Sequence, residues 1–117
     1  DTCHLIASGY DIASEDGYAQ TFADFERLIG FDRLAVIHAN DSKKPCGGRV
    51  DRHEHIGEGC LGEAPFARIA NDPRFDGLPM ILETAKSTEA GRPNAVTLDP
   101  LDVKNLTTLR RLRAGAA

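Results

Sequence analysis

The sequence predicts an α/β fold with a parallel sheet, forming part of a (β/α)8 TIM barrel. Two short apolar runs, Leu34–Ile37 and Leu78–Leu82, have the length and composition of strands buried on both faces. Helical periodicity appears between and after these runs, and strands that alternate with helices are typical of parallel sheets. A complete TIM barrel needs roughly 250 residues. The 117 residues of this chain are therefore expected to hold only part of one.

Three helices are expected around the strands. Thr21–Ile29 carries its apolar side chains on one face, and Gly30 follows as a stop signal. Glu63–Ala70 has a proline near its first turn and is followed by an Asn-Asp-Pro break. A third helix is predicted to begin at Asp99–Pro100, with a leucine at every third position and arginines toward its end.

The remaining segments are predicted as loops. The chain is expected to start as a loop that leads into the first helix. The polar stretch Ala39–Gly62 contains five glycines and is too long for a simple connector. Loops of this length in compact domains are usually functional or disordered.

Composition limits the class of protein. With 41% hydrophobic and 27% charged residues, residues 1–117 are expected to form one globular domain, without a separate second domain. No apolar run reaches the roughly 18 residues of a membrane helix, and no secretory signal is visible. The three cysteines at positions 3, 46 and 60 lack metal or disulfide spacing, which favours free thiols in a reducing cytoplasm. The net charge of −4 does not by itself indicate nucleic-acid binding, although bound metals would neutralise acidic ligands.

Both predicted strands are followed directly by a metal-capable residue. His38 follows Ile37, and Glu83 follows Leu82. Functional groups in TIM barrels lie at the carboxyl ends of the strands, so these two side chains are predicted to share one site.

Other segments supply further metal-capable side chains. Asp51 and His53 are two residues apart and would face the same side of an extended segment. Asp1 and His4 are three apart, so either the chain turns there or they serve different metals. Histidine and carboxylate suit zinc or manganese. Taken singly, each residue could equally be a solvated surface group, and Cys3 and Cys60 are expected to be small packing residues. The predicted ligand set is Asp1, His4, His38, Asp51, His53 and Glu83.

A series of sequence motifs makes the interpretation of these residues as metal ligands more specific. They are DTCH at 1–4, ASGYD at 7–11, HANDSK at 38–43, GRVDRHEHIGEG at 48–59, PMILET at 79–84 and NLTTLR at 105–110. In order and spacing they resemble the endonuclease IV-type apurinic/apyrimidinic (AP) endonuclease family, over nearly the whole chain. The fold that this resemblance implies is a TIM barrel of the xylose-isomerase-like type.

The resemblance also implies a cluster of three metal ions, usually zinc, with manganese as a possible substitute. His4, Asp51 and His53 would together hold one zinc. Asp1, His38 and Glu83 would hold part of a second. The family's remaining ligands, two histidines and a bridging glutamate, would lie upstream of Asp1. The chain is therefore expected to be the C-terminal portion of the enzyme, marginally stable and inactive alone.

The implied activity is base excision repair, by hydrolysis of the phosphodiester 5′ to an abasic site in double-stranded DNA. Glu83, His38 and Asp1 would act through a metal-activated water. Three basic residues near the ligands, Lys43, Arg49 and Arg52, are candidates for phosphate contacts. The complete enzyme is expected to be a cytoplasmic monomer.

Two alternatives remain open. One is a sugar isomerase or epimerase of the xylose-isomerase-like barrels, which shares the strand-end metal site but does not need the Asp51–His53 segment. The other is a fragment that binds zinc without turnover. A complete protein with three metals favours the nuclease, and one with one or two favours the isomerase.

Overall fold

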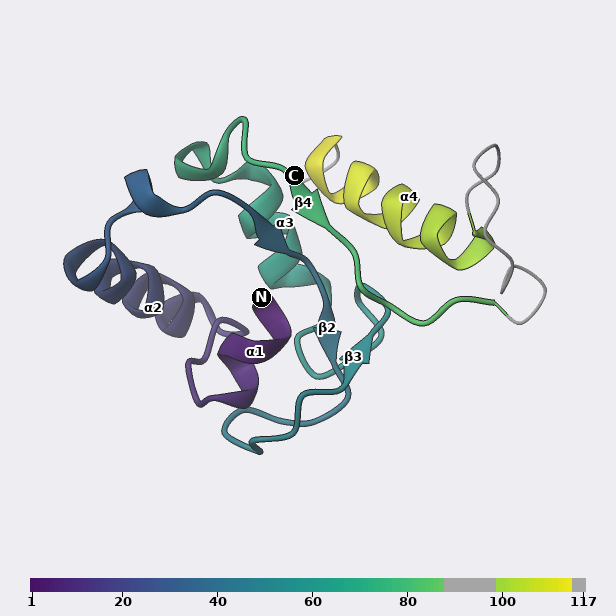
Figure 1. Cartoon of the computed structure of the whole chain (residues 1–117), viewed down its shortest axis with the longest axis horizontal. Helices are drawn as coiled ribbons and strands as arrows, with labels where there is room; N and C mark the ends of the chain where they lie inside the picture. Colours follow the sequence, from purple (N-terminus) through teal and green to yellow (C-terminus); the bar gives the residue numbers. More distant parts are fainter. Residues whose placement is uncertain (88–98, 115–117) are drawn as a thin grey trace.

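The computed structural model describes residues 1–87 and 99–114 (Figure 1). At its centre, β1 (Ile37–His38) and β4 (Met80–Ile81) run parallel, with Ile37 opposite Met80 and His38 opposite Ile81. The chain passes between them through α3 (Glu63–Asn71), as in a strand–helix–strand unit. The predicted parallel α/β arrangement is therefore confirmed.

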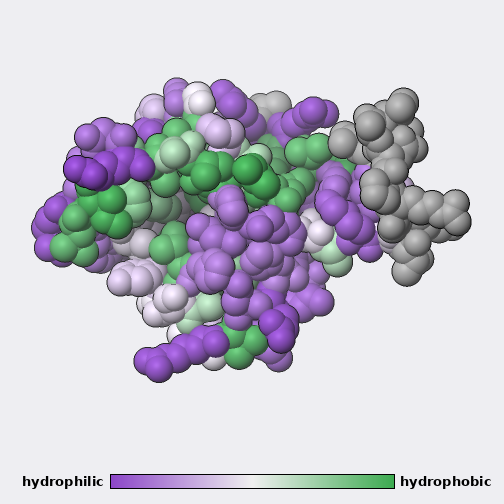
Figure 2. Space-filling model, in the orientation of Figure 1, coloured by the Kyte–Doolittle hydropathy of each residue, from purple (hydrophilic) through white to green (hydrophobic). Residues whose placement is uncertain are grey.

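The two strands are shorter and less covered than predicted. Only two residues of each apolar run pair, and both Ala35 and Ile81 are exposed, Ile81 at 46%. The prediction of strands buried on both faces was therefore wrong. In the described ranges β1 and β4 also pair only with each other. Figure 2 shows the result as an apolar band across the middle of this face.

The three predicted helices are present, with one early start. The helix predicted from Thr21 is α2 (Glu15–Leu28), which begins six residues sooner because the Ser14 side chain accepts a hydrogen bond from the Gly17 amide at 3.0 Å. Gly30, with φ of 99°, ends it. The helix α3 agrees with prediction to within one residue.

The last helix, α4 (Pro100–Ala114), packs against α3. It starts where predicted, since the Asp99 carboxylate accepts a hydrogen bond from the Leu101 amide at 2.8 Å. Two single turns, η1 (Phe31–Arg33) and η2 (Pro73–Phe75), follow α2 and α3. The η2 turn lies at the Asn-Asp-Pro sequence that was predicted to end α3.

The start of the chain is a helix and not the predicted loop. This helix, α1 (Thr2–Ala7), is capped by Asp1, whose Oδ1 accepts from the amides of Cys3 (2.8 Å) and His4 (3.3 Å). The turn of the chain between Asp1 and His4 is thus a helical turn, which puts residues three apart on one side.

The stretch Ala39–Gly62 also contains structure that the sequence did not predict. Two short strands, β2 (Asp41–Ser42) and β3 (His53–Glu54), pair antiparallel within it. The Asp41 side chain, fully buried, then holds the glycine-rich end of the stretch in place. It accepts five backbone hydrogen bonds of 2.8–3.2 Å, from Ser42, Gly57, Gly59, Leu61 and Gly62.

The main core lies between α1, α2, α3 and the central strands. Phe22 and Phe75 meet edge to face at 5.1 Å, and Phe31 packs against both. The Arg74 guanidinium lies 5.0 Å from the centre of the Phe31 ring. No helix in the described residues is long and apolar enough to span a membrane.

Candidate metal centre

The six predicted ligands converge at one end of the central strands. They come from segments far apart in the sequence: the start of α1, the end of β1, the start of β3 and the segment that follows β4. The members are Asp1, His4, His38, Asp51, His53 and Glu83. The structure thus brings together every residue of the predicted set.

The first group combines the two strand-end residues with the start of the chain. His38 Nδ1 contacts the Glu83 carboxylate and lies 3.9 Å from Asp1 Oδ2. One ligand atom from each of the three lies within 4.8 Å of the others. The parallel pairing of β1 with β4 puts residues 38 and 83 at the same edge, as the strand-end rule predicts.

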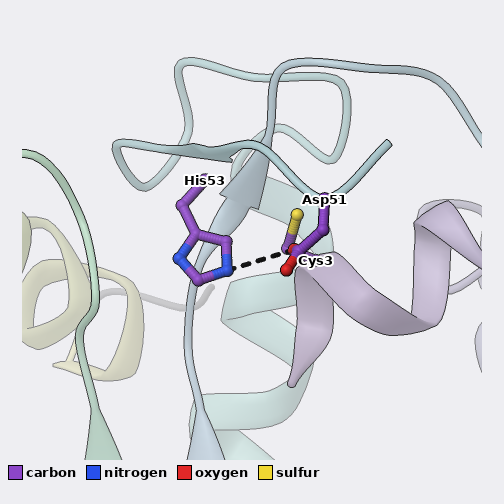
Figure 3. Close-up of side chains that lie close together, drawn as sticks. All are labelled: Cys3, Asp51 and His53. Carbon is purple, nitrogen blue, oxygen red and sulfur yellow. Dashed lines mark ion pairs between the residues drawn. The ribbon is translucent and has the colours of Figure 1, made fainter. Parts of the chain in front are cut away.

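The second group is built around the approach to β3. His53 Nε2 lies 3.2 Å from Asp51 Oδ1, the ion pair drawn in Figure 3. His4 Nε2 lies 2.8 Å from the other oxygen of Asp51. The spacing of two between Asp51 and His53 therefore places both on one side, as predicted.

Asp1 joins the two groups. Its side chain is only 9% exposed. While Oδ1 caps α1, Oδ2 lies 3.3 Å from His4 Nδ1 and 3.4 Å from His53 Nε2, as well as near His38. One carboxylate oxygen therefore faces three imidazole rings.

The tautomer of His53 is suited to a metal. Its Nδ1 lies 2.9 Å from the backbone carbonyl oxygen of Glu83, which only accepts, so Nδ1 donates and Nε2 is the nitrogen that a metal would bind. Among the described residues, buried Nε2 makes no hydrogen bond, although carboxylate oxygens of Asp51 and Asp1 lie 3.2 and 3.4 Å away. Metal-binding histidines usually donate their second ring N–H in this manner.

The donor spacing also fits an ion. Two atoms bound at about 2.0–2.1 Å to one tetrahedral zinc are about 3.3 Å apart. Separations of 3.2–3.4 Å occur at His4 with Asp1 and at His53 with both Asp1 and Asp51. Nitrogen and oxygen donors at this spacing are compatible with a bound divalent metal ion.

Cys3 lies at the edge of the second group. Its sulfur lies within 4.8 Å of ligand atoms of Asp51 and His53, where the resemblance assigns His4 (Figure 3). Cys3 is fully buried, its thiol donates to the Arg52 carbonyl oxygen at 3.6 Å, and burial raises the thiol pKa. These features favour a protonated packing residue, as expected. Cys60 is exposed instead, and all three cysteines are free.

The basic residues proposed to meet phosphate lie on the exposed segment between β2 and β3. Lys43, Arg49 and Arg52 are all exposed. Arg49, with φ of 57°, lines an open cavity of about 310 Å³ together with His4 and Asp51, and its amide donates to the Ala7 carbonyl. The positions are compatible with phosphate contacts, which stay a prediction.

Two buried polar residues beside the site were missed by sequence reasoning. Asn40 is fully buried, and its side chain contacts Asp1 and the backbone of Glu83. Asp41 holds the glycine-rich stretch, and although burial raises its pKa, the backbone donors oppose that rise. The available signal was the alternation from His38 to Asn40, which puts both on one side of an extended segment.

Comparison with known proteins supports the assignment made from the motifs. The chain belongs to the xylose isomerase-like TIM barrel family, whose model matches residues 1–104. Within that family it is similar to endonuclease IV, as the motifs indicated.

Two relatives and one solved structure illustrate the similarity. The chain is 52% identical to probable endonuclease 4 of Geobacter sulfurreducens over 96% of its own length, and 48% identical to that of Chloroflexus aurantiacus over 99%. It superposes on the crystal structure of endonuclease IV from Thermus thermophilus with a TM-score of 0.79 and 36% identity, over 100% of its length. The chain spans 35–38% of the length of these three proteins.

Proposed function

We propose that this chain supplies part of the active site of a zinc-dependent AP endonuclease, which hydrolyses the phosphodiester 5′ to an abasic site in double-stranded DNA. The observation that carries the proposal is the convergence of three histidines and three carboxylates at the ends of parallel strands. The names of the relatives, probable endonuclease 4, support the same activity.

The two groups of donors suit two ions. His4, Asp51 and His53 would hold one zinc, and Asp1, His38 and Glu83 would supply ligands to another. When bound, zinc supplies a water acidic enough to attack a phosphodiester near neutral pH, and stabilises negative charge on the phosphate and leaving oxygen.

The work of the chain itself is to fix the donors. The Glu83 carbonyl holds the His53 ring with Nε2 toward the carboxylates. The first turn of α1 holds Asp1, because the two backbone donors bind Oδ1 and leave Oδ2 directed at the histidines. A site fixed by backbone contacts needs little rearrangement when substrate arrives.

The segment between β2 and β3 would meet the DNA. Arg49 lines the cavity beside Asp51 and His4, so its guanidinium would reach a phosphate near the second group of donors. Lys43 and Arg52, also exposed, would offset the net charge of −4 where the backbone approaches. We place the complete enzyme in the cytoplasm as a monomer.

The test is incision of a duplex that carries a single abasic site, with added zinc. The 117-residue chain is compared with a chimera that joins it to the part of the Geobacter relative it does not cover. We expect incision by the chimera, loss of incision in its His38→Ala form, and no cut in a duplex without the abasic site. A folded, zinc-loaded chimera that leaves the abasic duplex intact would reject the nuclease and favour the sugar isomerase.

A further inference from the structure

A buried asparagine connects the segments that carry the donors. Asn40 is fully buried, two residues after His38. Its backbone amide donates to Thr2 Oγ1 at 2.9 Å, and its carbonyl oxygen accepts from the same hydroxyl at 2.6 Å. These contacts span 38 residues of sequence and fasten the first turn of α1 to the end of β1.

The side-chain amide of Asn40 makes two further contacts. Its Oδ1 accepts from the Glu83 backbone amide at 2.8 Å, and its Nδ2 lies 3.4 Å from Asp1 Oδ2 as a donor. A backbone N–H only donates, so Oδ1 must face Glu83 and Nδ2 must face Asp1. The orientation of this amide is therefore fixed by its partners.

We infer that Asn40 is a positioning residue for the Asp1–His38–Glu83 group, holding the Asp1 carboxylate at the angle that metal binding needs. The inference rests on the proposed function. One asparagine touches Asp1 and Glu83 directly and follows His38 by two residues, so it sets the spacing of all three. Residues that orient metal ligands in this way commonly change metal affinity when they are replaced.

The chemistry of the side chain is specific. A leucine of similar size would leave the Glu83 amide without its acceptor in a buried place. An aspartate would keep that acceptor but set a second carboxylate beside Asp1, where two like charges repel. Of the common side chains of this size, only an amide presents an acceptor to one partner and a donor to the other.

A second buried asparagine provides the control. Asn105, 1% exposed, accepts from the Ile56 amide at 2.9 Å and donates to Thr84 Oγ1 at 3.0 Å. It too ties distant segments together, but neither contact involves a proposed ligand. Asn105→Ala should therefore lower stability as Asn40→Ala does, without the same effect on the metal.

The experiment is a titration with Co²⁺ of the chimera described above, which supplies the part of the relative that this chain does not cover, and of its variants. Visible absorption follows the titration, because it reports ligand number and geometry. We expect Asn40→Ala to weaken one class of bound Co²⁺ roughly 10- to 100-fold, and Asn105→Ala to leave both affinity and spectrum unchanged. Asn40→Asp keeps the acceptor for Glu83, so it tests the role if the alanine variant does not fold. Its Co²⁺ spectrum should shift.

The outcomes separate the two proposals. If the unaltered chimera binds Co²⁺ and both Asn40 variants bind it with the same affinity and spectrum, Asn40 has no positioning role although the metal site stands. Equal weakening by Asn105→Ala would also overturn the inference, since the effect would then follow from stability alone. An unaltered chimera that is folded but binds no Co²⁺ would overturn the metal site and this inference together.

Discussion

Two buried carboxylates in this molecule are satisfied in opposite ways. Asp41 receives five backbone hydrogen bonds and needs nothing else. Asp1 uses one oxygen to cap α1 and directs the other at three imidazole rings. The first arrangement is complete within the protein and stabilises a loop. The second gathers nitrogen and oxygen donors from several segments around one oxygen, which is why we propose it as the functional one.

The largest expected effect on stability comes from disrupting the hydrogen bonds around Asp41. In Asp41→Asn the amide group would face backbone N–H groups that need an acceptor, all in a buried place. We expect a loss of about 3 kcal/mol or more in the free energy of unfolding, measured by urea denaturation. Asp76→Asn, at an exposed position, is the matched control and should change stability little. Equal midpoints for the two variants would show that Asp41 does not hold the loop.

The site around Asp1 should instead gain stability when a metal ion binds. Zinc at roughly 100 times its dissociation constant should stabilise the chain by about 2.7 kcal/mol, seen as a rise in the thermal midpoint that a chelator reverses. His53→Ala should abolish most of this rise, because it removes the nitrogen left free for the ion.

The control for that experiment is the fourth histidine. His55 contacts Asn105 and lies outside the ligand set. His55→Gln should therefore keep the zinc-dependent rise. A rise that survives in His53→Ala and disappears in His55→Gln would mean that the ion binds elsewhere.

A glycine beside Asp41 tests how tightly its loop is packed. A Cβ on Gly59 would lie 2.4 Å from the Ser42 carbonyl oxygen and 2.6 Å from Asp41 Oδ1. Gly59→Ala should cost roughly 1–3 kcal/mol as the loop shifts to avoid this overlap. Gly48→Ala, where the nearest atom would be 3.1 Å away on an exposed turn, should cost less. Urea midpoints rank the two, and a reversed order would contradict the close packing at Asp41.

A third carboxylate, that of Asp72, is expected to make the smallest contribution to stability. Burial tends to raise the pKa of Asp72, but hydrogen bonds from Arg74 and Tyr18 outweigh it and lower the pKa below its ordinary 3.8. A lowered pKa contributes stability above pH 3.8, and this contribution disappears as pH falls through the folded-state value. Asp72→Asn should thus cost less than about 1 kcal/mol near neutral pH.

Stability measured against pH gives the check. The gap between the unaltered chain and Asp72→Asn should close as pH falls below about 3.8. Asp76→Asn, which alters an exposed carboxylate in the same segment, serves for comparison and should show a smaller gap at every pH. A gap for Asp72→Asn that widens in acid would have the wrong sign for a paired carboxylate.

Local pattern predicted much of the fold and part of the geometry of the proposed site. His38 and Glu83 followed from apolar runs that end in polar residues, since the ends of parallel strands share an edge. Asp51 and His53 followed from a spacing of two. These inferences hold because they depend on periodicity, which neighbouring residues alone determine.

The missed features depend on partners far along the chain. Most contacts of Asn40 and Asp41 reach residues 16 to 43 positions away, and the alternation from His38 to Asn40 alone does not distinguish them from polar loop residues. Helix α1 was missed because six residues give less than two full turns of periodicity. The coverage of the strands was predicted wrongly because burial depends on what packs above them, which their own sequence does not record.

Helix α1 adds a consequence for the thermodynamics of the site. Six residues are too few for a helix to persist alone in water, so α1 depends on its cap and its docking. Its cap and the proposed metal ligand are two oxygens of one aspartate. Formation of α1 and binding of the ion are therefore thermodynamically linked. If the ion stabilises the capped helix by a given factor, fraying of the helix weakens ion binding by that same factor.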